Sequence, residues 1–279
     1  MTLLDTIELL AAAWPSDILA RIDGLPIRAF RFGVADRRAP VLLVTAGVHG
    51  LERIGVELAV AYLRSLHARM AWDAPLAKGL ESARIIVVPA VNPVGLQRGT
   101  RANGRGVDLM RNAPAAATGG TPLVGGHRIS SRLPWYMGTA MEPEAAALCR
   151  LVEELSEAPL ILALDLHSYF GITDRLWYPY ARTREPPPDL PAIQALTGLL
   201  DAAWPNHAYI IEQTARVYTI RGDLWDYLYD LPRTGKLISL TLEVATLRPR
   251  GRERTLRRHL PFIELMFHAA ASHAAWLRA

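Results

Sequence analysis

Two residues that bind metal ions well, His49 and Glu52, lie three positions apart, where an apolar run gives way to a helical pattern. This spacing at the start of a helix points both side chains to one side. Two imidazoles and one carboxylate, with water in the fourth position, form a common catalytic zinc site. The pair also has an ordinary reading, because the helix dipole alone favours a glutamate at a helix start. A metal site therefore requires a third ligand from elsewhere in the chain.

Other polar residues stand at the ends of further apolar runs. Asp165 and His167 close one run, Glu243 closes a later one, and Asn92 follows an earlier one. In open α/β sheets the ligand crevice lies at the carboxyl ends of the strands. Four runs thus deliver polar side chains toward one edge, three of them with histidine or glutamate, and His167 is the candidate third ligand.

The elements that must position these residues alternate between strand and helix. Near-continuous apolar runs are typical of strands buried on both faces, and apolar positions three and four apart are typical of helices. The predicted strands are 39 to 47, 83 to 93, 158 to 168 and 236 to 246, and the predicted helices are an N-terminal one and 52 to 70, 142 to 156, 189 to 204 and 255 to 277. This alternation predicts a single α/β domain over residues 1 to 279, with a mixed, mainly parallel sheet and helices on both faces. The long irregular segment 113 to 140 is expected to wall a site.

Composition places the chain among ordinary globular proteins. Of its 279 residues, 51% are hydrophobic and 21% are charged. The N-terminus lacks the features of a signal peptide, its apolar run is too short to span a bilayer, and Cys149 is the only cysteine. We therefore expect a cytoplasmic protein without a membrane partner or an intramolecular disulfide.

The formal net charge of +4 raises the question of an acidic partner. The densest arginine cluster is 248 to 258, whereas Lys78 and Lys236 are the only lysines, so an arginine-rich composition explains the basicity. Such a cluster is usually a solvated face, and no aromatic interleaving or recognisable binding module accompanies it. No nucleic-acid partner is expected, and the oligomeric state is not determined by the sequence.

The order of the motifs resembles the zinc carboxypeptidase family, whose prototype is carboxypeptidase A. That family has His-x-x-Glu, Asn-Pro, an arginine, Asp-x-Asn-Arg-Asn, Glu-Pro-Glu, a strand-end His-Ser, a tyrosine-rich stretch and a glutamate on a late strand. The corresponding segments here are "HGLE" (49 to 52), "NPVG" (92 to 95), Arg101, "DLMRN" (108 to 112), "MEPE" (141 to 144), "LHSY" (166 to 169), "WYPY" (177 to 180) and "TLEV" (241 to 244). The resemblance runs from about residue 40 to residue 246.

The resemblance implies a role for each matching residue. His49, Glu52 and His167 would bind Zn²⁺. Glu243 would act as general base toward the attacking water and then as general acid toward the leaving amine. Arg101 would add a positive charge facing the developing oxyanion. Metal-bound imidazoles usually donate their other N–H to a carboxylate or carbonyl, and either Asp165 or Asp108 is available for this support.

Arg111 matches the arginine that binds the terminal carboxylate of the substrate in the family, and its planar guanidinium suits a bidentate contact. The chain departs from the family at the preceding position, where Met110 replaces an asparagine that would share that carboxylate. This replacement weakens the case for a strict exopeptidase.

Two further substrate contacts follow from the resemblance. The tyrosine that closes over the substrate has the candidates Tyr218 and Tyr209, and Tyr218 is favoured because it precedes a Trp-x-Tyr unit at Trp225. Asp223, two positions before that tryptophan, would favour a cationic leaving residue. Arg221 is close enough in sequence to neutralise this carboxylate, and Asp223 is equally suited to cap the helix that follows.

The leading expectation is a zinc hydrolase that cleaves a peptide or amide bond next to a free carboxylate, acting on a peptide or an acyl amino acid. The alternatives are an amidase that cuts the γ-D-glutamyl-diaminopimelate bond of murein peptides, an N-acyl-amino-acid deacylase of the succinylglutamate desuccinylase or aspartoacylase type, and a non-catalytic metal-binding relative. The Asn-Pro, Glu-Pro-Glu and His-Ser segments favour the peptidase side. Glu243 and Arg101 argue against a pure binder, which has no evident use for a proton shuttle.

Overall fold

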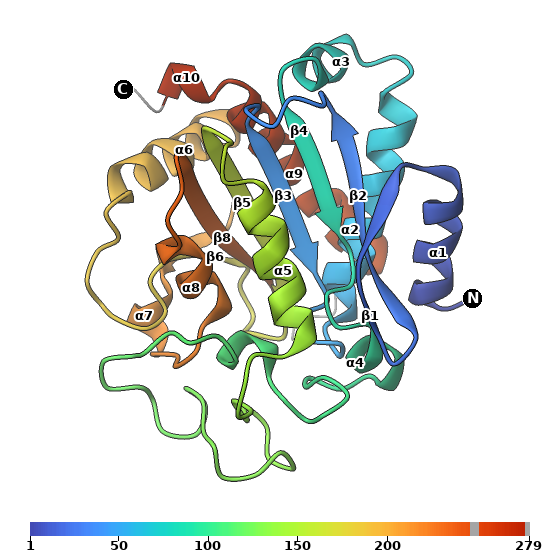
Figure 1. Ribbon diagram of the computed structural model, residues 1–279. Helices are drawn as coiled ribbons and strands as arrows, with labels where there is room; N and C mark the ends of the chain where they lie inside the picture. The colour runs from blue at the N-terminus through green and yellow to red at the C-terminus, as the bar shows by residue number, and fades with distance from the viewer. Residues whose placement is uncertain (246–250, 277–279) are drawn as a thin grey trace.

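Eight strands form one mixed sheet (Figure 1). The structure, a computed structural model, describes residues 1 to 245 and 251 to 276. The strands are β1 (Ser16–Ile22), β2 (Leu25–Gly33), β3 (Val41–Ala46), β4 (Arg84–Val88), β5 (Leu160–Ser168), β6 (Arg175–Tyr178), β7 (Ile210–Gln213) and β8 (Lys236–Val244). Their order across the sheet is β1-β2-β4-β3-β5-β8-β6-β7.

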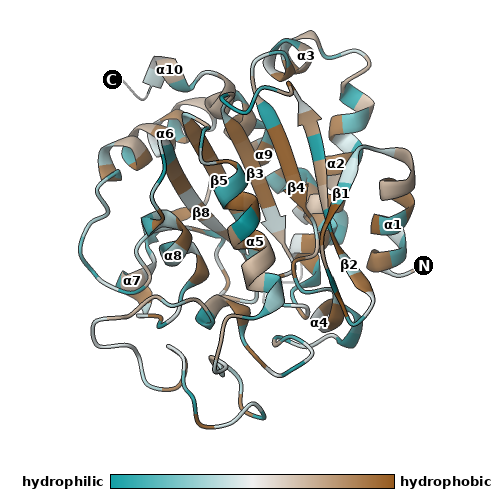
Figure 2. Cartoon of the chain, in the orientation of Figure 1, coloured by the Kyte–Doolittle hydropathy of each residue, from teal (hydrophilic) through white to brown (hydrophobic). Residues whose placement is uncertain are grey.

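Four parallel strands, β4, β3, β5 and β8, make up the centre of the sheet. Strands β2 and β6 flank this centre in antiparallel orientation, and β7 runs parallel to β6 at one edge. All residues of β3 and β5 are buried, as expected for strands covered on both faces, and Figure 2 shows the apolar colour of the central strands. The prediction of a mixed, mainly parallel sheet is confirmed.

Helices cover both faces of the sheet, which confirms the predicted α/β class. They are α1 (Leu3–Ala13), α2 (Arg53–Arg69), α3 (Ala74–Leu80), α4 (Pro93–Arg98), α5 (Pro143–Glu154), α6 (Leu190–Ala203), α7 (Thr214–Val217), α8 (Leu224–Asp230), α9 (Arg252–Ala271) and α10 (His273–Trp276), with a 3₁₀ turn at Leu109–Arg111. One apolar core contains residues of α1, α2, α6 and α9, and a second, on the other face, contains residues of α5 and α8 (Figure 1). Within the described ranges, no helix is both long and apolar enough to cross a membrane.

The predicted strands and helices are present, with differences at some ends. The predicted strand 83 to 93 is too long, because β4 ends at Val88 and Pro93 begins α4. The predicted last helix is divided at Ser272 into α9 and α10. Thr246 and Leu277, the ends predicted for β8 and for that helix, lie outside the described residues, as does part of the arginine cluster.

A hairpin that the apolar runs did not predict joins β1 to β2. Its turn consists of Asp23 and Gly24, with φ angles of 49° and 82°. Asp-Gly between alternating apolar residues is a strong hairpin signal, because a two-residue type I′ turn requires positive φ at both positions. The sequence "RIDGLPI" carries this signal.

Cys149 provides a test of the packing of α5 against the sheet. It is 6% exposed, and burial raises the pKa of its thiol to about 11. Because the thiolate is the reactive form, we expect a disulfide reagent such as DTNB to label native protein at least about 100-fold more slowly than urea-unfolded protein. Absorbance at equal pH measures both rates. Fast labelling of the native protein would contradict this packing.

Candidate active site

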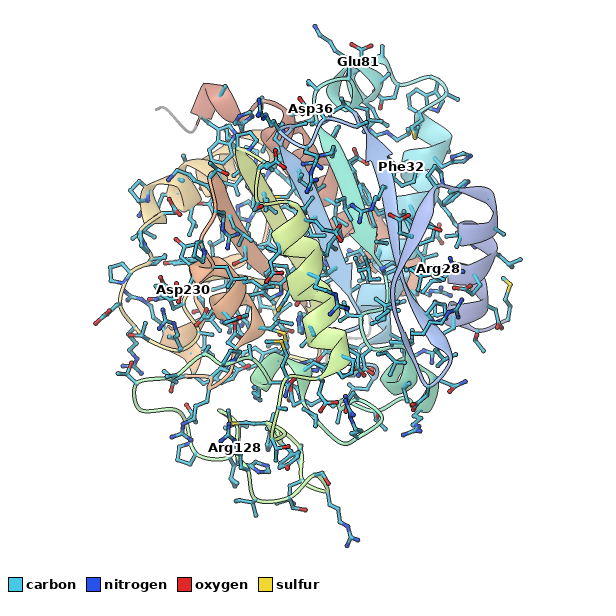
Figure 3. All side chains as sticks on the ribbon, in the orientation of Figure 1. Arg28, Phe32, Asp36, Glu81, Arg128 and Asp230 are labelled. Atoms are coloured by element: carbon cyan, nitrogen blue, oxygen red, sulfur yellow. The ribbon has the colours of Figure 1, made fainter. Side chains whose placement is uncertain are left out.

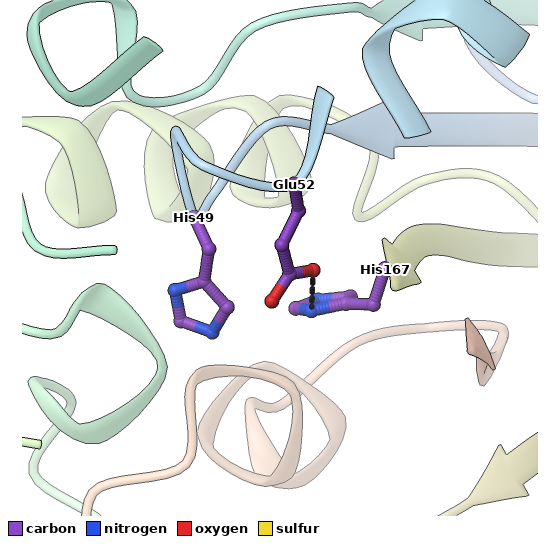
Figure 4. Close-up of side chains that lie close together, drawn as sticks. All are labelled: His49, Glu52 and His167. Atoms are coloured by element: carbon purple, nitrogen blue, oxygen red, sulfur yellow. Dashed lines mark ion pairs between the residues drawn. The ribbon is translucent and has the colours of Figure 1, made fainter. Parts of the chain in front are cut away.

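Three potential metal ligands converge at the carboxyl edge of the sheet. His49 lies in the turn after β3, Glu52 is the N-cap of α2, and His167 lies near the end of β5. One ligand atom from each lies within 4.8 Å of the others, and all three residues are buried. Figure 4 shows the side chains directed toward one another. The tertiary structure thus brings together the three residues predicted to bind the metal.

Hydrogen bonds fix the orientation of His167 and Glu52. His167 Nε2 lies 2.6 Å from Asp165 Oδ2, and His167 Nδ1 lies 3.2 Å from Glu52 Oε2. The backbone N–H of Ser168 donates to the same Glu52 oxygen at 2.8 Å. These contacts leave Nδ1 as the nitrogen of His167 that faces the centre of the cluster.

Asp165 supports His167, and Asp108 lies beside His49. Asp165 also accepts hydrogen bonds from Thr45 Oγ1 at 2.7 Å and from Trp225 Nε1 at 2.8 Å. Asp108 Oδ1 lies 3.9 Å from His49 Nδ1. Burial lowers the pKa of His49 well below its usual value. Burial acts in the same direction on His167, but the carboxylates of Asp165 and Glu52 outweigh it and raise that pKa well above the usual value.

Replacing Asp165 tests its support of His167. We expect Asp165→Asn to weaken zinc binding about 10- to 100-fold, the usual cost of losing a partner of a ligating histidine. Competition with a chromophoric chelator measures the affinity directly. Asp17→Asn, at an exposed ion pair with Arg31, is the control. If Asp165→Asn binds zinc as tightly as wild type, Asp165 does not support His167 as a ligand.

Glu243 faces the same cluster from β8. It is the register partner of His167 in the parallel pair of β5 and β8. Its side chain is buried, and Oε2 has no hydrogen-bond partner among the described residues. Burial, together with the neighbouring negative charge of Glu52, raises the pKa of Glu243 above its usual value. Because no described residue occupies Oε2, this oxygen is available to a molecule in the cavity.

One buried carboxylate, Asp108, holds both predicted arginines. Arg101 Nε donates to Asp108 Oδ2 at 2.8 Å, and Arg111 Nη1 lies 3.6 Å from the same atom. Arg101 Nη1 also lies 3.5 Å from Glu52 Oε1. Burial opposes ionisation of Asp108, but the two guanidinium groups lower its pKa well below the usual range. Two fixed positive charges therefore stand next to the candidate metal cluster.

A cavity of about 480 Å³ connects all the predicted site residues. Its lining includes His49, Glu52, Arg101, Arg111, His167, Tyr218, Asp223 and Glu243. Val124 and Trp135 from the segment 113 to 140 also line it, so this segment walls the site as expected. Arg128, labelled in Figure 3, lies on the part of the segment that projects away from the sheet.

The structure distinguishes the two tyrosine candidates by position. Tyr218 lines the cavity, where its ring stacks on Phe170 with centroids 6.1 Å apart. Tyr209 lies in the core, and its hydroxyl is hydrogen-bonded to His259 Nδ1 at 2.8 Å. Of these two candidates, only Tyr218 therefore lines the cavity.

Asp223 both lines the cavity and caps α8, because its side chain accepts a hydrogen bond from the N–H of Asp226 at 2.9 Å. The suggestion that Arg221 neutralises Asp223 is wrong. The Arg221 guanidinium lies near the carbonyl groups of Gly120 and Gly126, and within the described residues it forms no ion pair with Asp223.

Asn92 and Met110 have different surroundings. Asn92 caps α4, and its amide donates to the carbonyl of Val48 at 3.3 Å, so it supports the turn that carries His49. Met110 is 6% exposed and lines the cavity beside Arg111. The cavity therefore has a thioether where the family pattern has an amide.

Several lining residues were not anticipated from the sequence. Ser239 and Thr241 precede Glu243 at intervals of two on β8, so strand alternation alone could have placed them on the same face. Asp226 accepts hydrogen bonds from the N–H groups of Ala181 and Arg182. Its place in the wall depends on a contact between distant segments, which no local pattern reveals.

Comparisons with known proteins agree with this geometry. A segment of 140 residues is 33% identical to murein peptide amidase A of Escherichia coli strain K12, covering 48% of this chain and 52% of the relative. The match thus spans about half the length of that curated relative. Carboxypeptidase A from Helicoverpa armigera superposes with a TM-score of 0.69 at 20% identity, covering 99% of this chain and 72% of that one. Murein-tripeptide amidase MpaA from Escherichia coli O157 superposes with a TM-score of 0.56 at 24% identity, covering 91% and 93%.

The two structural likenesses show the fold. The family model for zinc carboxypeptidase matches residues 21 to 251, which is most of the chain. With the fold, the His-Glu-His cluster and this match, the chain belongs to the zinc carboxypeptidase family of hydrolytic enzymes.

Proposed function

We propose that this protein is a zinc-dependent hydrolase that cleaves a peptide or amide bond next to a free carboxylate. The observation that carries the proposal is the carboxyl oxygen of Glu243 that has no partner in residues 1 to 245 and 251 to 276, and that shares one cavity with the His49, Glu52 and His167 cluster. The family match supports the hydrolase class. The proposal keeps the expected cytoplasmic location, and the buried, free Cys149 is consistent with it.

The donor set fits zinc. Two imidazoles and one carboxylate leave an open coordination position, as in catalytic zinc sites. The buried Nδ1 of His49 has no hydrogen-bond partner among the described residues, and His167 turns Nδ1 toward Glu52. When bound, zinc lowers the pKa of a water molecule to about 7 and polarises the substrate carbonyl.

The residues of this chain supply the remaining steps. Glu243 accepts a proton from the attacking water through its free oxygen and then delivers a proton to the leaving amine nitrogen. Arg101, held by Asp108, provides a fixed positive charge toward the oxyanion that develops on the carbonyl. Because Asp108 holds this guanidinium before the substrate arrives, little reorganisation is needed during the reaction.

Arg111 and Tyr218 are proposed to bind the substrate. Arg111 is 2% exposed and lines the cavity, so a substrate carboxylate that reaches it is removed from water, where a charge-assisted hydrogen bond is strong. Met110 beside it cannot share that carboxylate, because a thioether donates no hydrogen bond. This favours substrates whose acid group is placed differently from that of an ordinary C-terminal residue.

A murein-peptide amidase is the second candidate. The partial match to murein peptide amidase A favours it, as does the acidic Asp223 in the cavity, because diaminopimelate carries an amine at the end of its side chain. Deacylation of an N-acyl amino acid is a further option that the carboxylate-binding role of Arg111 would also serve.

Three substrate sets distinguish these possibilities. The zinc-loaded protein would be assayed with peptides that end in lysine, arginine or leucine, with muropeptides that contain the γ-D-glutamyl-diaminopimelate bond, and with N-acyl amino acids. We expect kcat/KM for one set to exceed that for the others by at least about 100-fold, a discrimination of about 3 kcal/mol. Absence of hydrolysis in all three sets by zinc-loaded protein would contradict the proposed function.

The charge state of Asp223 gives a pH-dependent prediction. Burial raises the pKa of Asp223 to about 6, so the carboxyl is neutral below that pH and anionic above it. We expect the preference for lysine over leucine as the leaving residue, measured as a ratio of kcat/KM values, to rise about tenfold between pH 5 and pH 7. Asp223→Asn keeps a good N-cap residue and should abolish this rise. A ratio that is independent of pH in wild type would argue against contact between Asp223 and a cationic group.

A further inference from the structure

Arg175 lies opposite Glu243 in the sheet, yet their side chains do not pair. Strands β6 and β8 are antiparallel, and Arg175 is the register partner of Glu243. Directly opposed residues of such a pair project to the same face, with Cβ atoms about 4.5 to 5.5 Å apart. The next opposed pair on the same face, Trp177 and Thr241, lines the cavity, so this is the face of the candidate active site. The Arg175 guanidinium is therefore within reach of the Glu243 carboxylate.

Arg175 pairs instead with Glu212 on β7. Arg175 Nη1 forms an ion pair with Glu212 Oε1, and the same oxygen accepts a hydrogen bond from Trp177 Nε1 at 3.2 Å. The parallel register of β6 and β7 places Trp177 opposite Glu212. The Arg175 guanidinium also lies over the ring of Phe170, with Cζ 5.4 Å from the centroid, a favourable cation–π distance.

The consequence for Glu243 is a carboxyl group that forms no ion pair with any residue the structure describes. Within the described part of the chain, Arg175 forms no ion pair with Glu243, and Glu243 Oε2 has no hydrogen-bond partner. An arginine binds a carboxylate through two parallel hydrogen bonds. Such a contact would occupy the oxygens that must take a proton from the attacking water.

We propose that Glu212 is a positioning residue that holds Arg175 away from Glu243 and so keeps the general base available. The inference rests on the proposed function, in which Glu243 transfers the proton. Glu212 acts only through Arg175. Removing its negative charge would leave a partly buried guanidinium beside an unpartnered carboxylate on the adjacent strand.

Glu212→Gln tests this role with little change in shape, because the amide oxygen can still accept the Trp177 hydrogen bond. We expect kcat to fall about tenfold or more, part of the 10²- to 10⁴-fold that a general base contributes, with KM within about twofold of wild type. The double variant Glu212→Gln/Arg175→Met should recover the kcat of Arg175→Met alone. Glu253→Gln, at the exposed Arg257 ion pair, is the matched control. A crystal structure of Glu212→Gln should show Arg175 turned toward Glu243.

Each outcome decides the inference. A low kcat in both Glu212→Gln and the double variant would show that Glu212 only supports the sheet edge. An unchanged kcat in Glu212→Gln would show that Glu212 does not restrain Arg175. Either result overturns the proposal. Glu243→Gln, assayed in parallel, separates this from a failure of the proposed function. If Glu243→Gln is inactive while Glu212→Gln is normal, only the inference about Glu212 fails.

Discussion

Glu243→Gln is expected to lower kcat by about 10²- to 10⁴-fold, the usual contribution of a general base. The amide has the same shape but cannot take a proton from the attacking water. KM should change little, because Glu243 is proposed to act on the water and the leaving group. Since Oε2 of the buried wild-type carboxyl has no hydrogen-bond partner among the residues that the structure describes, the variant should fold as stably as wild type. Steady-state kinetics and thermal unfolding measure both effects.

The matched control for this variant is Glu57→Gln. Glu57 lies on α2 and pairs with Arg252 on α9, outside the cavity lining. It should retain the wild-type kcat. Zinc content should remain near one ion per chain in Glu243→Gln, because His49, Glu52 and His167 are unchanged. A Glu243→Gln variant that hydrolyses its substrate as fast as wild type would refute the proposed proton transfer.

Loss of zinc is the second large effect. We expect His49→Ala and His167→Ala to bind less than a tenth of the wild-type zinc and to lose hydrolysis entirely, because two protein ligands do not complete the site. Dialysis of wild type against a chelator should abolish activity, and added Zn²⁺ should restore it. Metal analysis by mass spectrometry and activity assays on the same samples give the comparison.

Removal of zinc should also lower the free energy of unfolding. A ligand that binds only the folded state stabilises it by about 4 kcal/mol when its free concentration is a thousand times its Kd. The midpoint of thermal unfolding of wild type should therefore fall on chelation, while that of His49→Ala should not respond to the chelator. His259→Ala would serve as a comparison for loss of a buried histidine outside the cavity. Equal zinc content in His49→Ala and wild type would exclude His49 as a ligand.

The apolar runs predicted the central strands of the sheet, because a near-continuous apolar run favours a strand that is buried on both faces. Strands β3, β5 and β8 are rich in leucine and β-branched residues. Because apolar residues occupy both faces of each strand, neither face is suited to contact with water. The hairpin at Asp23 and Gly24 also had a local signal, in its turn. The short strands β6 and β7 had none, because four residues each do not establish a periodicity.

The motifs and their order were sufficient to identify the candidate chemistry. His49, Glu52, His167 and Glu243 could be selected because each follows or closes a predicted strand, and the carboxyl ends of parallel strands meet at one edge. The order of the motifs, from His-x-x-Glu to the late glutamate, carried the family resemblance. Residue types and the order of the motifs are properties of the linear sequence, so they can be recognised before the fold is known.

Which side chains share the cavity, and which of them pair, became clear from the folded chain. Both Tyr218 and Tyr209 were candidates in the sequence. In the structure Tyr218 lines the cavity, whereas Tyr209 is buried against His259. Arg221 was close to Asp223 in sequence but faces the carbonyl groups of another loop. The partner of a charged side chain depends on strand register and on contacts between distant segments, and local sequence encodes neither of them.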